Sequence, residues 1–227
     1  MRDVIVLCEG QTEREFCRSV IAPGLHRAGV SVAGTLVGKP QRKRGGISAW
    51  PVYRNEIRRL AKQRVDWHVG VLVDYYAMPD SWPGRATAPG KPPADRGLHV
   101  EDALRDDLDA DMGGRFIPCV QLHEFESLLF AVPETTAESL QSNAGDFSAD
   151  LIEGKLNEVL EQCGGLVEQI DDGPTTAPSK RLATILPRYD KVAWGVLAAD
   201  AAGLDELRAG CPWLDRWLSS LESIGGA

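Results

Sequence analysis

Short runs of apolar residues, each followed by a polar or glycine-containing segment, recur through the first half of the chain. Residues 4–8 and 69–73 are continuously apolar, which is typical of strands buried on both faces of a parallel sheet. Residues 30–37 and 115–122 predict two further strands. Pro118 indicates an edge position for the last strand, because proline cannot donate a ladder hydrogen bond.

The segments between these runs carry apolar residues at helical spacing. They predict a helix after the first strand, opened by a capping box of Thr12 and Glu15, and helices over 51–64 and 98–110. Residues 76–96, rich in proline, glycine and alanine, predict a long surface loop. Strands that alternate with helices predict an α/β fold with a mostly parallel sheet flanked by helices.

The strand pattern stops after about residue 133, and the rest of the chain predicts helices alone. These helices are expected over 149–163, 179–188, 191–199 and 212–223. We therefore expect an α/β core over residues 1–132 and a helical C-terminal extension over 133–227, packed on that core.

The composition narrows the class of protein. The chain has 227 residues, of which 43 % are hydrophobic and 26 % charged, as in ordinary globular proteins. No apolar run approaches the roughly 18 residues that span a bilayer, and the N-terminus lacks a signal-peptide pattern. Five scattered cysteines without a C-x-x-C pair argue against a disulfide framework and a zinc knuckle. We expect a cytoplasmic protein that does not bind membranes.

Acidic residues follow three of the predicted strands. Glu9 follows the first strand, Asp74 the third, and Glu124 lies just past the last. Ligands of open parallel sheets bind beyond the carboxyl ends of the strands, so three carboxylates at neighbouring ends would form a site for Mg²⁺ or Mn²⁺. The alternative is that each acid is a polar residue where the chain leaves the core. Glu9 is the strongest candidate, because Gly10 permits close backbone approach.

Other residues near these acids leave alternatives open. Glu13 and Glu15 either belong to the site or serve the dipole and cap of the following helix. His123 is either a general base, a metal ligand or a hydrogen-bonded structural histidine. Only one of Glu124 and Glu126 can face the site if that segment is extended, with Glu124 preferred and Glu126 the other metal-ligand candidate.

One segment of this acidic protein is strongly basic. Residues 39–64 hold nine basic residues against one acid, a net charge of +8. Since the whole chain has a net charge of −8, the remaining residues carry a net charge of −16. Cations on one helical stripe and in the preceding loop could bind the phosphate backbone of a nucleic acid. The alternative is that they form a solvated helix face without a ligand. The predicted nucleic-acid-binding residues here are Arg42, Lys43, Arg44, Arg54, Arg58 and Lys62.

A second group of basic residues follows a turn. Residues 172–174 predict the turn, and Ser179, Lys180 and Arg181 then open a helix. Lys180 is a candidate catalytic residue that neutralises developing charge, and Arg181 a candidate phosphate contact. The alternative is a capped helix with exposed cations. The chain lacks a P-loop, G-x-G-x-x-G and G-x-S-x-G, so nucleotide hydrolysis and acyl transfer have no support.

Several segments together resemble a known group of proteins. Residues 4–13 (VIVLCEGQTE) resemble the first Toprim motif, in which a strand delivers a glutamate followed by glycine, and residues 71–76 (VLVDYY) resemble the second. With the segments HEFESLLF (123–130), DGPTTAPSKR (172–181), YDK (189–191) and CPWLDRWL (211–218), the chain resembles a prokaryotic family of Toprim-like proteins without an established activity.

The resemblance implies a Toprim/Rossmann-like fold and metal-dependent phosphodiester chemistry, as in overcoming-lysogenization-defect nucleases. By position, Glu9 corresponds to the motif glutamate and Asp74 to the first aspartate of Asp-x-Asp. Tyr76 stands where the second aspartate belongs, so either Glu124, Glu126 or Asp80 replaces it or catalysis has been lost.

Two functions follow from the residues and the resemblance. The first is a Mg²⁺- or Mn²⁺-dependent nuclease acting on DNA or RNA, in phage defence or DNA repair, with a partner ATPase and as a monomer or homodimer. The second is a non-catalytic or partner-dependent interaction subunit of an ATPase-containing complex, which Tyr76 and the exposed-looking Trp213 and Trp217 favour.

Overall fold

The computed structural model describes residues 1–38, 47–141, 147–170, 173, 175–187 and 189–226. Within them, the chain divides into two compact units: Met1–Leu122 with Trp217–Ala227, and His123–Arg216. The sequence places a boundary after residue 132 instead, and it does not anticipate that the C-terminal residues belong to the first unit. No helix in the described residues is long and apolar enough to cross a membrane.

The first unit is built on a parallel sheet. Among the described residues four strands pair in the order β2-β1-β3-β4, all in parallel, which confirms the predicted fold class. The strands lie close to their predicted positions and are β1 (Arg2–Cys8), β2 (Val30–Leu36), β3 (His68–Asp74) and β4 (Phe116–Gln121). β4 is an edge strand, as Pro118 predicts.

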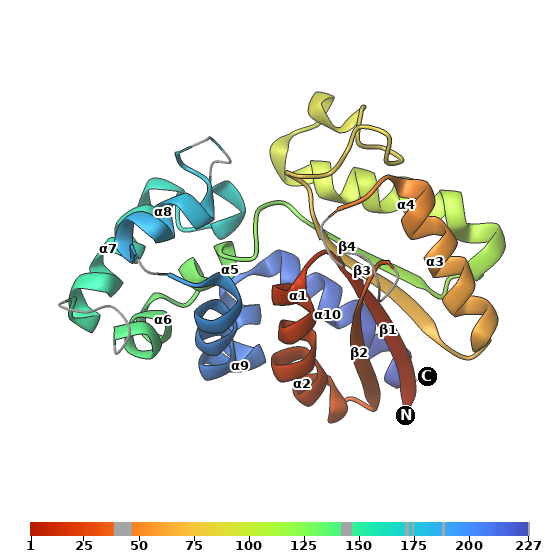
Figure 1. The fold of residues 1–227 in the computed structure, drawn as a ribbon, viewed down its shortest axis with the longest axis horizontal. Helices are drawn as coiled ribbons and strands as arrows, with labels where there is room; N and C mark the ends of the chain where they lie inside the picture. The colour runs from red at the N-terminus through yellow and green to blue at the C-terminus, as the bar shows by residue number, and fades with distance from the viewer. Residues whose placement is uncertain (39–46, 142–146, 171–172, 174, 188, 227) are drawn as a thin grey trace. The chain divides into compact units, whose positions relative to one another are not determined.

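Helices cover both faces of this sheet (Figure 1). Alternate residues of each central strand face opposite sides, and both faces are covered, so the middle of β1 (residues 4–8) and of β3 (residues 69–73) is apolar. Leu7, Val71 and Val120 pack with the buried stripes of α3 (Trp50–Gln63) and α4 (Arg96–Met112). The other face is covered by a continuous helical segment, made of α1 (Gln11–Phe16), a π-helical turn (Cys17–Ile21) and α2 (Ala22–His26), and by the end of α10 (Pro212–Gly225).

Residues 76–96 are more than a surface loop. Met78, Trp82 and Ala88 are buried in the core, and the Trp82 indole nitrogen donates a hydrogen bond to the Ser48 carbonyl at 2.8 Å. The Trp82 ring packs against Trp50 and Tyr53, with ring centroids 5.0 and 4.9 Å apart. The prediction of a purely superficial segment was wrong, because its many glycines and prolines obscured these scattered anchors.

The second unit is helical in the described residues, as the sequence predicts for this part of the chain. Its core includes Phe125, Leu128, Leu129 and Phe130, so the HEFESLLF segment supplies apolar packing as well as acids. Its helices are α5 (Ser127–Phe130), α6 (Pro133–Leu140), α7 (Ala149–Gln162), α8 (Pro178–Ile185), a π-helical turn (Lys191–Gly195) and α9 (Val196–Gly210), and α10 begins in it.

Candidate metal-binding site

The strand order places a topological switch point, where open α/β sheets hold a ligand crevice, at the carboxyl ends of the two central strands. β2 pairs with one side of β1, and the chain then crosses back to form β3 on the other side of β1. Helices following β1 and β3 therefore diverge to opposite faces, and ligands of open α/β sheets bind at such a switch point. Glu9 follows β1 directly and Asp74 is the last residue of β3, so both stand at this crevice.

A backbone hydrogen bond holds the two acids together. The Asp74 N–H donates to Glu9 Oε2 at 3.2 Å, and the Glu9 N–H donates to the Leu72 carbonyl at 3.1 Å. Asp74 Oδ1 accepts a hydrogen bond from the Ala77 N–H at 3.4 Å. Both carboxylates are partly exposed. The sequence correctly predicts that these two residues meet, and their oxygens are the donors that hard cations prefer.

A third carboxylate does not complete the crevice within the described residues. No group of three or more histidine, cysteine, aspartate and glutamate side chains in this part of the chain could hold a metal ion. Tyr76 is 52 % exposed, and Asp80 pairs at 3.6 Å with Arg85. Arg85 in turn lies over the Tyr75 ring, 4.1 Å from its centroid. Waters and substrate phosphate oxygens would supply the remaining ligands, as they do for many Mg²⁺ ions.

Glu13 and Glu15 serve the helix that follows β1. The helix begins at Gln11, and Glu13 Oε2 accepts a hydrogen bond from the Gly10 N–H at 2.8 Å. The predicted capping box of Thr12 and Glu15 was therefore displaced by two residues. Glu15 instead pairs with Arg18 and Arg14, at 2.7 and 2.8 Å, and their hydrogen bonds lower the pKa of its carboxyl.

Glu124 lies in the second unit and caps a helix there. Its Oε2 accepts a hydrogen bond from the Ser179 N–H at 3.0 Å, at the first turn of α8. The sequence predicts that the N-terminus of α8 binds phosphate, but in the structure the Glu124 carboxylate binds there. Lys180 is exposed on the same helix. The Arg181 guanidinium donates to the Thr176 carbonyl at 2.7 Å, a contact within its own helix start.

Glu126 is a buried acid of the second unit. Its side chain is 1 % exposed, and Oε2 lies 2.9 Å from the Lys191 ammonium nitrogen. Burial raises the pKa of Glu126, and the nearby Lys191 charge only partly offsets this effect. Burial, followed by the charge of Glu126, also raises the pKa of the Tyr189 hydroxyl. Residues of the HEFESLLF and YDK segments therefore meet in one cluster, a contact that neither segment alone predicts.

His123 has a structural partner. Its Nε2 lies 2.9 Å from the Glu168 carbonyl oxygen. The Glu168 carboxylate accepts a hydrogen bond from the Trp213 N–H at 3.0 Å. Both contacts lie in the second unit, and they favour the interpretation of His123 as a hydrogen-bonded structural residue.

The basic stripe on α3 is largely neutralised by the neighbouring helix. Arg54 pairs with Asp107 at 2.9 Å, and Arg58 pairs with Asp111 at 2.6 Å. The two arginines and the two aspartates are each four residues apart, which is the signal in the sequence that could have paired them. Lys62 is exposed. Arg42, Lys43 and Arg44 lie outside the described residues.

A comparison with protein-family models identifies the family of this chain. The chain belongs to the family described as "Domain of unknown function (DUF4276)", whose profile matches residues 8–222. No match was found among the curated proteins.

Among solved structures, the chain is similar to the C-terminal region of the Burkholderia pseudomallei OLD protein. The two are 14 % identical with a TM-score of 0.50, over 99 % of this chain and 98 % of that one. The C-terminal region of the Xanthomonas campestris pv. campestris OLD protein matches at 15 % identity and a TM-score of 0.41, over 96 % of this chain and 95 % of that one. The likeness to the Burkholderia pseudomallei structure shows a similarity of fold.

Proposed function

We propose that this protein is a metal-dependent nuclease of the Toprim type, which holds Mg²⁺ or Mn²⁺ with Glu9 and Asp74. The observation that carries the proposal is the meeting of these two carboxylates at the switch point of a parallel sheet. Active sites of open α/β sheets form at this place. The sequence motifs around both residues resemble the Toprim glutamate and its first aspartate.

The residues of the crevice fit such a cation. Two carboxylates suffice where waters and phosphate oxygens complete the coordination shell. The hydrogen bond from the Asp74 N–H occupies one lone pair of Glu9 Oε2 and orients that carboxylate toward β3. A bound cation supplies Lewis-acid polarisation of the phosphoryl group and a more acidic water. A Cβ at Gly10 would lie only 2.9 Å from Glu13 Oε2, so glycine beside Glu9 makes room for the carboxylate that caps the following helix.

The step from metal site to nuclease rests on resemblance. The family and the fold likeness to an OLD C-terminal region support a nuclease-related assignment. A function in phage defence or DNA repair, beside a partner ATPase, belongs to the same proposal. Glu124, Glu126, Lys180 and Arg181 belong to the second unit. Glu9 and Asp74 carry the proposed chemistry, and a role of the other four residues in it stays a prediction from the sequence.

Cleavage assays with matched variants test the proposal. Plasmid and single-stranded DNA and RNA are incubated with purified protein and Mn²⁺, Mg²⁺ or EDTA. Metal-dependent cutting is expected, and Glu9→Gln and Asp74→Asn are each expected to lower it at least about a hundredfold, as losses of active-site electrostatic groups do. Glu15→Gln is the control, because Glu15 pairs with Arg14 and Arg18 on the following helix. Full activity of either site variant contradicts the assignment.

Binding of the metal alone provides a second readout. Mn²⁺ titration by calorimetry or by paramagnetic NMR relaxation requires no substrate and no partner. The protein and its Glu15→Gln variant are expected to bind Mn²⁺, whereas Glu9→Gln and Asp74→Asn are not. Metal binding without cleavage would support the metal site and contradict nuclease activity of the protein on its own.

The second candidate function is a non-catalytic subunit of an ATPase-containing complex. It is favoured by Tyr76, whose exposed ring stands where the Toprim pattern has an aspartate. This function predicts no Mn²⁺ binding, no cleavage and co-purification with an ATPase. Specific Mn²⁺ binding that Asp74→Asn removes would contradict it.

A further inference from the structure

The amino ends of the strands carry a cavity that the proposed metal site does not use. It has a volume of about 360 Å³ and lies at the opposite end of the sheet from Glu9 and Asp74. Basic groups dominate its polar lining. Arg2 begins β1, His68 begins β3, and Arg115 immediately precedes β4, so the parallel register brings these residues together.

Acidic groups compensate the cations of this cavity only in part, since the one acid of its lining that acts on Arg115 is Asp66. Within the described residues neither Arg2 nor Arg115 forms an ion pair with a carboxylate, and the Arg115 guanidinium donates to the Trp67 carbonyl at 2.8 Å. The one acid in the lining, Asp66, is exposed and pairs with Arg64 at 3.2 Å. Two guanidinium groups without an ion pair therefore lie beside His68 in a protein of net charge −8.

His68 has an unsatisfied ring nitrogen in the same place. Its Nδ1 is buried without a hydrogen-bond partner in the described residues. Burial lowers the pKa of His68, and the positive charges of Arg115 and Arg2 lower it further. The charged groups around it are Arg2 from β1, Arg115 from the start of β4 and Asp66 from the preceding turn, while α10 contributes the uncharged Ser223 and Ile224. An anion here would both accept hydrogen bonds and relieve the repulsion.

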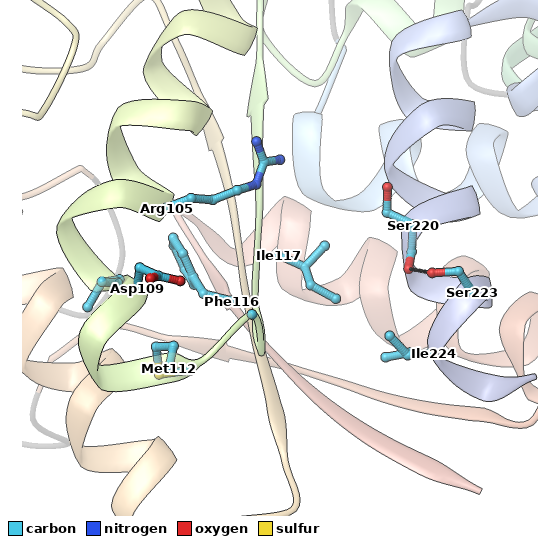
Figure 2. A pocket seen from close by; sticks show the side chains of 10 residues that line it. Arg105, Asp109, Met112, Phe116, Ile117, Ser220, Ser223 and Ile224 are labelled. Carbon is cyan, nitrogen blue, oxygen red and sulfur yellow. Dashed lines mark hydrogen bonds between the residues drawn. The ribbon is translucent and has the colours of Figure 1, made fainter. Parts of the chain in front are cut away.

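A second cavity adjoins the first, and its lining combines apolar side chains with the charged Arg105 and Asp109. It has a volume of about 410 Å³ and lies between α4, β4 and α10. Figure 2 shows Met112, Phe116 and Ile117 on one part of its wall and Ile224 on α10 on the other. Ser223 and Ile224 line both cavities, so the two share a wall. The Ser223 hydroxyl donates to the Ser220 carbonyl at 2.8 Å, which leaves its oxygen as an acceptor.

We propose that Arg2, His68 and Arg115 bind the phosphate group of a small phosphate monoester, whose organic part occupies the adjoining cavity between α4, β4 and α10. Guanidinium groups suit the doubly charged phosphate because several N–H donors can face its oxygens at once. The apolar part of that cavity's lining gives an aromatic or ribosyl part a place to bury its surface, and Ser220 and Ser223 offer polar contacts. The site is independent of the proposed nuclease function and lies at the other end of the sheet.

Calorimetric titration in EDTA tests the phosphate half of this site, since chelation removes any contribution from a metal in the Glu9 crevice. Inorganic phosphate is expected to bind, and Arg115→Gln and Arg2→Gln are each expected to weaken it about tenfold or more, as the loss of a charge-assisted hydrogen bond does. Arg2→Gln is the safer variant, because its side chain is exposed at the strand end. Arg18→Gln, a neutralised surface arginine elsewhere in the unit, is expected to bind phosphate normally.

The adjoining cavity is tested by comparing two ligands. Adenosine monophosphate is expected to bind more tightly than inorganic phosphate, and Ser220→Leu, which fills part of the cavity, is expected to remove that advantage while phosphate still binds. Equal affinity for the two ligands would overturn the assignment of the organic part and reduce the site to one for inorganic phosphate.

The His68 imidazole gives an independent readout by NMR. Phosphate is expected to raise the pKa of His68, because the added negative charge offsets Arg2 and Arg115. A structural role of these residues would not produce that shift. Absence of phosphate binding in folded protein, or binding that neither arginine variant weakens, would overturn the proposal.

Discussion

Burial changes what a carboxylate does at Glu126. The folded protein raises the pKa of this residue above its ordinary value of 4.5, because the side chain is 1 % exposed and Lys191 compensates only in part. The folded state therefore holds a proton on Glu126 more tightly than the unfolded state does. By linkage, the free energy of unfolding falls as pH rises from about 4.5 through the raised folded pKa, and stays at the lower level above it.

Glu126→Gln is expected to remove this pH dependence. The neutral amide keeps the shape of the side chain and carries no desolvation cost for a charge, while Lys191 remains 37 % exposed and accessible to water. The stability of the variant relative to the wild type should therefore rise between pH 4.5 and neutral pH, as measured by urea unfolding across this range. Glu138→Gln, an exposed position on α6, is the control and should leave the pH slope unchanged. An unaltered slope in Glu126→Gln would contradict the expectation.

Residues close to a strand end are the candidate residues whose positions the sequence predicts well. Glu9 and Asp74 were placed correctly because each follows an apolar run, and parallel strands bring such ends together. The partners of Glu126 and Arg54 could not be found in this way. Lys191 and Asp107 lie on other elements, so both pairs depend on how helices pack, and only the matched four-residue spacing of the arginines and aspartates hints at the second pair.

At the scale of elements, β4 illustrates how an edge strand is protected. The carbonyl groups of Arg115 and Gln121 accept hydrogen bonds from β3. Backbone groups alternate in direction along a strand, so those of Pro118 and Val120 point away from β3, toward the open edge. Pro118 has no N–H to expose. The Val120 N–H donates to Glu101 Oε1 at 2.9 Å, and Glu101 itself is fully buried on α4. Both devices discourage another strand from pairing here.

Removal of the Glu101 carboxylate is expected to weaken this arrangement. Glu101→Ala leaves the Val120 N–H without its acceptor, and the loss should destabilise the protein by about 1–3 kcal/mol in urea unfolding, with more aggregation through the freed edge. Asp102→Ala is a matched control, because Asp102 also pairs with Arg105 but its side chain is 70 % exposed. That variant should cost about 0–1 kcal/mol. Equal effects of the two substitutions would argue against edge protection.

Elements with a regular apolar period were predicted closely, and irregular ones were not. The strands and the helices α3, α4, α7 and α10 lie near their predicted bounds, since periodicity reports which face is buried. Residues 76–96 lack a period, and Trp82 alone did not reveal that the segment enters the core. Gly84 shows how such a segment is fitted. Its φ is 76°, and a Cβ at this position would lie only 3.1 Å from the Val100 Cα, so both the backbone conformation and the close approach favour glycine.

At the scale of the whole molecule, the chain leaves the first unit at Leu122 and returns to it at Trp217. The sequence predicts a single boundary because composition changes only once, from strands and helices to helices alone. Nothing local marks the return, since Trp217 lies in an amphipathic helix like its neighbours. Its indole is nevertheless completely buried, and Nε1 donates to the Ile117 carbonyl at 3.3 Å. The expectation of an exposed Trp217 was therefore wrong.

This return should make the sheet depend on the C-terminal residues. Trp217→Ala removes a large buried side chain beside Gly70, and a loss of about 3–5 kcal/mol is expected for the first unit. Hydrogen exchange of the β3 and β4 amides measures this loss separately from the second unit, because faster exchange there reports opening of the sheet. Trp213→Ala is the control: its half-buried ring lies in the second unit, with the Arg216 guanidinium 4.3 Å from its centroid. If Trp217→Ala left β3 and β4 protected, the C-terminal residues would be dispensable to the sheet.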